Sequence, residues 1–274
     1  MINIIQNTID ALGRRVASTP SFVGLLNTYS GAAIAYSLRQ LDSTYAGSAI
    51  RVRRSSDNTE QDIGFANNVI DTVSLLTFVG SGDGFVDTWY DQSGNANNMT
   101  QATASKQLRI VLSGVVSLLN GNPVMESVNN TNYLSTSNYI PSGSQQVVGV
   151  LSAPSYFGAK NIMIGSTSGG HYTYAAEVGS TATGISVGVT FSTETVNDSA
   201  FTYTDRNDVH TQLATQSILS SNAVFSYATS ILGLGYKSGD GGFGAYNLQE
   251  FIIFDNQTDQ SAKVTAINNH YSAY

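Results

Sequence analysis

The residues of this chain best suited to chemistry are a few carboxylates on predicted strands and turns. Hydrolysis of a glycosidic bond needs two carboxyl groups beside the scissile bond. Four acids could face a groove of a strand-rich fold: Asp91, Glu177, Asp240 and Glu250. Each is individually more typical of a turn or a surface, and the sequence alone brings no pair of them together.

Other kinds of reactive site find little support. The chain has no cysteine, which excludes disulfides and thiolate chemistry. His171, His210 and His270 are too widely spaced to suggest a zinc site, so we expect no metal ligands among them. Residues 239–244 match the G-x-G-x-x-G pattern, but a predicted strand follows it, which indicates a hairpin loop instead of a dinucleotide site.

Arginines and acids are densest in one predicted strand and the loop after it. Arg51 and Arg53 fall on one face of this strand, Arg54 on the other, and Asp57 and Asp62 follow within reach. Bidentate pairs that tie the loop to the strand are the favoured interpretation, and a ligand clamp is the alternative.

The only tryptophan lies in a strand that ends in a polar corner. Phe85–Tyr90 is aromatic and β-branched, which predicts a strand, and Asp91–Asn95 has the side chains of a turn. Trp89 and Tyr90 point to opposite faces. We favour a core position for Trp89, with a sugar-stacking platform as the alternative.

The elements that must position these residues are mostly short strands. Between residues 49 and 246, short apolar or alternating runs are separated by Gly, Asn, Ser and Asp, which predicts a single all-β sandwich or barrel. Ser30 could cap a helix over residues 31–41. A closing helix should follow Asp255, with Val264, Ile267 and Tyr271 on one face.

Residues 1–23 differ from the rest. Ile5, Ile9, Leu12 and Val16 recur at helical spacing, which predicts a short helical segment. Such a short helix is unstable alone in water, so we expect it to dock on its own domain, on a second copy or on a larger assembly. The chain is divided accordingly into a docking segment, 1–23, and a domain, 24–274.

Composition limits the partners. The net charge of −7 disfavours nucleic acid, and no apolar run approaches the ~20 residues of a membrane span. Charged residues make up 11%, against about 25% in typical soluble domains. The first residues lack the features of a secretory signal peptide, so we expect neither a signal peptide nor membrane insertion.

Several of these segments resemble the catalytic domain of α-L-arabinofuranosidase B. The resemblance covers roughly residues 24–274 and is carried by residues 32–41, 45–58, 62–64, 88–95, 249–255 and 270–274. It implies a two-sheet antiparallel jelly-roll sandwich of the concanavalin A-like, laminin-G-like type that ends in the C-terminal helix. The predicted helical segment over residues 1–23 lies outside the resemblance. Modules of this type also occur in bacterial surface proteins and bacteriophage virion proteins.

The family's catalytic positions match less well. In the family, the catalytic acid follows a strand similar to Ile231–Gly235, but Tyr236 and Lys237 stand here where Gly-Asp would be expected, and Asp240 comes three residues later. Glu177 is a loose candidate for the nucleophile. The family's adjacent cysteine pair is missing. The resemblance also implies that Ca²⁺ could bind, with the acidic loop 80–84 as a candidate, although a plain turn is favoured there.

Three hypotheses follow. The favoured one is a non-enzymatic bacteriophage virion protein of head-fibre, spike or tail-fibre type, located on the particle. It would form a homotrimer, contact other virion proteins through residues 1–23, and bind a host-surface glycan through Tyr172, Tyr236 and Trp89. The alternatives are a retaining arabinofuranosidase-like glycoside hydrolase that uses Glu177 and Asp240, and a bacterial carbohydrate-binding adhesion module.

Overall fold

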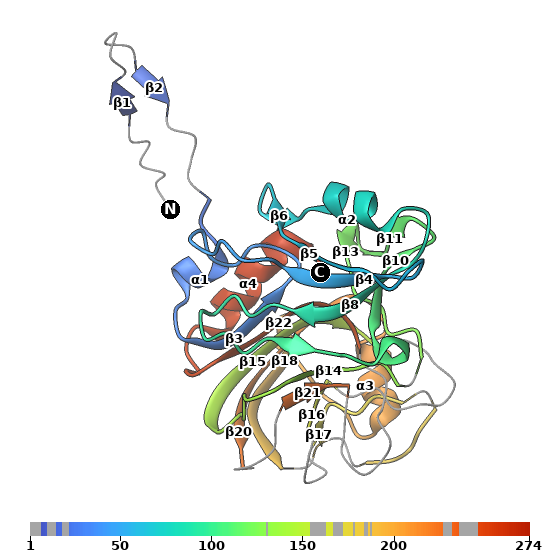
Figure 1. Cartoon of the computed structure of the whole chain (residues 1–274). Coiled ribbons are helices and arrows are strands. Elements are labelled where there is room, and N and C mark those ends of the chain that lie inside the picture. The colour runs from blue at the N-terminus through green and yellow to red at the C-terminus, as the bar shows by residue number, and fades with distance from the viewer. Residues whose placement is uncertain are drawn as a thin grey trace.

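Two antiparallel sheets face one another in the structure (Figure 1). The structure is a computed structural model that describes residues 7–9, 15–17, 22–129, 131–153, 163–166, 172–177, 179–183, 186, 188–226, 232–235 and 246–274. Within this part of the chain, one sheet has six strands and the other has ten. The predicted all-β sandwich is confirmed.

The six-stranded sheet contains the longest strands. Its order is β19 (Ser199–Ala200), β18 (Val189–Val196), β20 (Ser217–Phe225), β15 (Gly143–Ser152), β22 (Asn247–Phe254) and β3 (Ala32–Ser37). Side chains of β22 alternate between the two faces, with Phe251 and Ile253 in one apolar cluster and Ile252 and Phe254 in another. β22 is therefore buried on both faces.

The ten-stranded sheet is built from shorter strands. Its main path is β11 (Val115–Val116), β10 (Leu108–Leu112), β8 (Gly84–Trp89), β9 (Met99–Thr100), β14 (Leu134–Thr136), β21 (Leu232–Leu234), β16 (Ile164–Ser166) and β17 (Tyr172–Thr173). β4 (Ile50–Arg54) pairs with β8 and with β5 (Glu60–Ile63). Two small ladders, β6 (Phe65–Ala66) with β7 (Val69–Ile70) and β12 (Leu118–Leu119) with β13 (Asn122–Pro123), lie outside this sheet.

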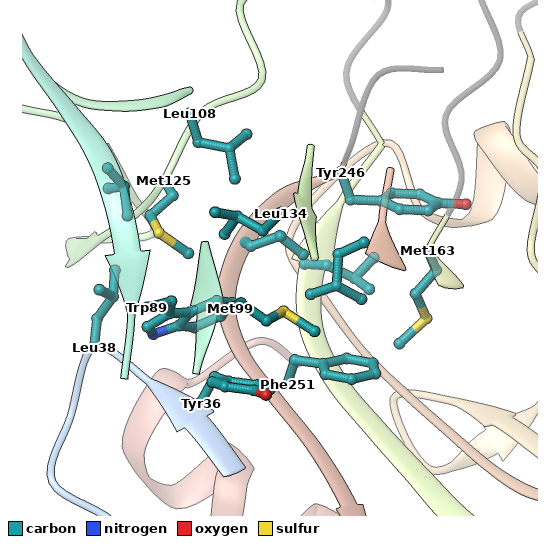
Figure 2. Close-up of a cluster of buried hydrophobic side chains, with 14 of the residues drawn as sticks. Tyr36, Leu38, Trp89, Met99, Leu108, Met125, Leu134, Met163, Tyr246 and Phe251 are labelled. Atoms are coloured by element: carbon teal, nitrogen blue, oxygen red, sulfur yellow. The ribbon is translucent and has the colours of Figure 1, made fainter. Parts of the chain in front are cut away.

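The main core fills the space between the two sheets. Trp89 is fully buried there, with its ring centroid 5.5 Å from that of Tyr36. Figure 2 shows Trp89 and Tyr36 among Met99, Leu134 and Phe251. The core interpretation of Trp89 is thus correct, and its proposed role in sugar binding is wrong, because both faces of a buried indole are already packed.

Helices cover the outer face of the six-stranded sheet. α4 (Gln260–Tyr271) packs there with Val264, Ile267 and Tyr271 buried, as the sequence predicts. α1 (Leu25–Thr28) lies beside it. α2 (Thr72–Val79), α3 (Arg206–Gln212) and a 3₁₀ turn (Ala104–Lys106) complete the helices of the described residues. No helix in this part of the chain is long and apolar enough to span a membrane.

Two predicted helices are wrong. Residues 32–37 form β3, because their backbone pairs with β22 at the sheet edge and this tertiary pairing outweighs the helix propensity of alanine. In the N-terminal segment, β1 (Asn7–Ile9) pairs with β2 (Arg15–Ala17) as a two-stranded ladder. The β-branched Thr8, Ile9 and Val16 favour strands over helix. A docking role for residues 1–23 remains a prediction.

Candidate functional site

A half-buried carboxylate, Glu194, lies on the six-stranded sheet and contacts a segment that follows the ten-stranded sheet. It is on β18, and it faces residues 172–177, which continue from β17, the last strand of the other sheet. The Tyr174 hydroxyl donates a hydrogen bond to Glu194 Oε1 at 2.8 Å. The Tyr203 hydroxyl lies 3.1 Å from Oε1 and 3.4 Å from Oε2.

Aromatic rings surround this carboxylate. Tyr174 stacks on Phe191 with ring centroids 4.9 Å apart and lies 5.8 Å from Phe201, which in turn lies 4.8 Å from Tyr203. Burial among these rings raises the pKa of Glu194, and the two tyrosine hydroxyls partly oppose this rise. A carboxyl group whose pKa is perturbed in this way is a candidate for a functional site.

Glu177 lies on the segment next to this carboxylate, but its charge is already paired. The guanidinium of Arg206 donates to Glu177 Oε2 at 3.1 Å, and the Glu177 amide donates to the Arg206 carbonyl at 3.1 Å. Tyr174 and Tyr203 each precede one member of this pair by three residues. The pair therefore joins the two segments that supply the tyrosines.

The other two candidate acids with described side chains are structural. Glu250 is fully buried on β22, where its carboxylate accepts two hydrogen bonds from Arg39, at 2.7 and 3.0 Å. Asp91 is buried at the end of β8 and accepts hydrogen bonds from backbone amides. Neither carboxylate is available to a substrate.

The structure does not describe the side chains of the remaining predicted site residues. Asp240 and Tyr236 lie outside the described residues. Tyr172 is described only through its backbone, which pairs with Gly165 in β16.

The arginine-rich strand forms the pairs that the structural interpretation predicts. Arg51 donates twice to Asp62, at 2.8 and 3.0 Å, and Arg54 donates twice to Asp57, at 2.8 and 2.6 Å. Arg53 lies over the Phe85 ring, with its guanidinium carbon 4.9 Å from the ring centroid. These contacts connect the strand to its own loop and to β8.

Two further places could hold a ligand. In loop 80–84, Asp83 accepts a hydrogen bond from the Ser113 amide at 2.7 Å, and within the described ranges no cluster of three or more His, Asp or Glu could hold a metal. A groove of about 560 Å³ between α1 and α4 is lined by Tyr29, Arg39 and Asn269, among others. No acid lines this groove, so it cannot supply a catalytic carboxylate pair.

Sequence reasoning missed Glu194. It lies within β18, which runs from Val189 to Val196. Glutamate is uncommon in strands, and its place between two threonines was the one local signal. The contacts with Tyr174 and Tyr203, 20 and 9 residues away, appear only in the folded chain.

Comparison with known proteins gives the class of this fold. A family model described as the catalytic domain of α-L-arabinofuranosidase B matches residues 27–119. This region begins within α1 and includes β3, β4, β8 and the corner at Asp91, and Glu194 lies outside it. No curated protein matches the chain.

Solved structures extend the likeness over most of the chain. An arabinofuranosidase complexed with arabinofuranosyl-α-1,2-xylobiose is 14% identical with a TM-score of 0.59, covering 91% of this chain and 64% of that one. A Glu-to-Gln mutant of a GH54 α-L-arabinofuranosidase soaked with 4-nitrophenyl α-L-arabinofuranoside is 17% identical, with a TM-score of 0.56. A GH54 enzyme soaked with a cyclic sulfate inhibitor is 16% identical, with a TM-score of 0.55. The match covers 88% of this chain and 62% of the other in both of these cases.

The chain thus has a two-sheet β-sandwich fold. Its particular fold is that of the GH54 arabinofuranosidases, and it spans less than two thirds of the length of those solved chains.

These matches correct the favoured hypothesis. The family model and the three structures concern arabinofuranosidases, and none of them is a virion protein. The prediction of a non-enzymatic bacteriophage protein of capsid or tail-fibre type is therefore wrong. It relied on the missing signal-peptide features, the N-terminal segment, the low charge and the poorly matched catalytic positions, and the arabinofuranosidase matches overturn it. Location and oligomeric state are not tested by these comparisons and remain predictions.

Proposed function

We propose that this protein is a glycoside hydrolase that acts on α-L-arabinofuranosides and that Glu194 is its nucleophilic carboxylate. The observation that carries the proposal is the environment of Glu194, which accepts hydrogen bonds from two tyrosine hydroxyls and is surrounded by aromatic rings. The matched family model and the similar fold support the substrate class.

The proposed reaction uses two carboxyl groups. The ionised Glu194 attacks the anomeric carbon, while a second carboxyl protonates the departing glycosidic oxygen; water then releases the sugar. Glu177 suits the role of proton donor poorly, because Arg206 holds it in an ion pair. Asp240 remains the prediction for the second carboxyl.

Covalent labelling tests the assignment of the nucleophile. An arabinofuranose-configured cyclic sulfate is an electrophile that alkylates a carboxylate, so it should add one label to the folded chain. Peptide mapping should locate this label at Glu194, and the variant Glu194→Gln should stay unlabelled. A label at Glu177 or Asp240 would overturn the assignment.

Turnover tests the reaction class. The wild type should hydrolyse 4-nitrophenyl α-L-arabinofuranoside, and Glu194→Gln should lower kcat by about 10³-fold or more, a loss typical of removing a catalytic carboxylate. Glu177→Gln is the matched control and should keep most of kcat. If the wild type binds arabinofuranosides without hydrolysing them, the protein is a carbohydrate-binding module and the proposal fails.

A further inference from the structure

Tyr174 has a backbone conformation that aromatic residues rarely adopt. Its φ is +52°, in the left-handed region. The other non-glycine residues with positive φ in the described part of the chain are Asn, Asp, Ser or Ala, so Tyr174 is the one bulky side chain among them. Strain of this kind persists only where the surroundings enforce it, and it is concentrated at functional sites.

Contacts on several sides hold Tyr174 in this conformation. The hydroxyl of Tyr246, the residue just before β22, donates a hydrogen bond to the Tyr174 carbonyl. The Tyr174 ring is fully buried between Phe191 and Phe201. The peptide and the ring are thus both fixed, and the direction of the phenol is fixed with them.

The phenol fixed in this way is aimed at one oxygen of Glu194. Tyr174 donates to Oε1 at 2.8 Å, and Tyr203 lies nearer to the same oxygen, at 3.1 Å, than to Oε2, at 3.4 Å. Oε1 therefore has the two shorter contacts, and Oε2 has only the long one.

We infer that Tyr174 is a positioning residue, whose strained backbone orients its hydroxyl to hold Glu194 Oε1 and to leave Oε2 as the attacking oxygen. This inference rests on the proposed function and adds to it the choice of reactive oxygen. Burial holds the pKa of Tyr174 well above its usual value, so its hydroxyl stays a donor at any pH at which the protein works.

A packing role alone would not need the hydroxyl. Phenylalanine offers the same ring to Phe191 and Phe201, so Tyr174→Phe keeps the ring packing and removes the hydroxyl that bonds Glu194. Tyr246→Phe leaves that bond but releases the strained carbonyl of residue 174. Tyr45→Phe is the control, since the Tyr45 hydroxyl bonds the Ser48 carbonyl in a local turn.

The pH dependence separates the two roles. The titratable groups whose hydroxyls contact Glu194 are Tyr174 and Tyr203, and the charges on the adjoining segments, Glu177 and Arg206, pair with each other. A donor to the ionised carboxylate lowers its pKa. Its removal should therefore shift the acid limb of kcat/KM to higher pH, whereas a lost packing contact would not.

The experiment compares the three variants with the wild type in kcat, KM and pH profile, and follows the ¹³C titration of the Glu194 carboxyl by NMR. Tyr174→Phe should lower kcat about 10- to 100-fold through misplacement of the carboxylate, with KM changed far less and the Glu194 titration moved to higher pH. Tyr246→Phe should show the same changes to a smaller extent, and Tyr45→Phe neither.

The outcomes separate this inference from the proposed function. An active wild type with an unchanged titration and acid limb in both Tyr174→Phe and Tyr246→Phe would overturn the inference and leave the function standing. An inactive wild type would overturn the function, and the role of Tyr174 with it, even if the titration moved. If Tyr174→Phe fails to fold, Tyr246→Phe decides, and its unchanged pH profile would count against the inference.

Discussion

The carboxylate of Asp91, in the corner after a strand of the ten-stranded sheet, accepts a hydrogen bond from the Ala35 amide in the other sheet, with Oδ1 and N 2.9 Å apart. Asp91 follows β8, and Ala35 lies on β3, the last strand of the six-stranded sheet. The amide of Gln92 donates to the Ala35 carbonyl at 2.7 Å. The corner therefore occupies the open edge of β3 as a neighbouring strand would, and it joins the two sheets.

Removal of this carboxylate should weaken the whole sandwich. Asp91 also accepts bonds from the partly buried amides of Ser93 and Asn97, so three backbone donors, including the buried amide of Ala35, would lose their partner. We expect Asp91→Ala to lower the free energy of unfolding by about 2–3 kcal/mol, measured by urea denaturation. Asp57→Ala, at an exposed turn, is the control and should stay near wild type. Equal losses in the two variants would refute the edge-closing role.

The ion pair between Arg39 and Glu250 should matter more than any surface pair. Glu250 is fully buried, and Arg39 also lies over the Tyr271 ring, 5.4 Å from its centroid. Glu250→Ala leaves a charge nearly buried and unpaired, so we expect a loss of about 3–5 kcal/mol in urea denaturation.

Two comparisons check this prediction. Asp62→Ala breaks the exposed pair with Arg51, whose side chains are each 41% exposed, and should cost under about 1 kcal/mol. The double variant Arg39→Met with Glu250→Gln should recover part of the loss, since it leaves no isolated charge. A small effect of Glu250→Ala alone would show that the pair is not buried in solution.

Tryptophan fluorescence should report the core and not the sugar. Trp89 is the only tryptophan, and it is fully buried in the apolar core. Its emission should be blue-shifted, protected from acrylamide, and unchanged when an arabinofuranoside is added to the Glu194→Gln variant. Emission that changes as the sugar saturates its site would place the indole near the ligand instead.

The burial of Glu194 should cost stability at neutral pH. Its pKa in the folded chain is raised above the ordinary value of 4.5, so the folded state holds this proton more tightly than the unfolded state. The stabilising contribution is full below pH 4.5 and is lost as pH rises through the folded pKa. The thermal stability of Glu194→Gln relative to wild type should therefore increase as the pH rises from 4 to 7.

Thermal stability measured over the same pH range should change in the opposite direction for Glu177→Gln. This variant breaks the ion pair with Arg206, so it should be less stable than wild type at pH 7. If Glu194→Gln also became less stable than wild type as pH rose, the ionised Glu194 would stabilise the fold, and it would be a structural carboxylate.

The N-terminal segment should associate. A two-stranded ladder such as β1 with β2 is marginal alone in water, so we expect light scattering to show a larger species for the full chain than for one lacking residues 1–23. Monomers in both samples would rule out docking between copies.

Local sequence was sufficient for the elements whose signals lie within a few residues. The closing helix α4 followed from the spacing of Val264, Ile267 and Tyr271, and the strand and corner around Trp89 and Asp91 followed from aromatic residues and a turn sequence. These preferences concern the backbone and its immediate neighbours, so they survive in the folded chain. The all-β sandwich follows from the number and spacing of such strands.

The tertiary structure decided the rest. Residues 32–37 have a composition that favours a helix, but pairing with β22 makes them a strand. Asp91 and Glu250 resembled catalytic acids until their partners, Ala35 and Arg39, were known. Glu194 is absent from the sequence-based candidates, because its two tyrosine partners are distant in the chain. The pKa and the exposure of a carboxyl group depend on which groups surround it in space, and strand pairing between distant segments determines those groups.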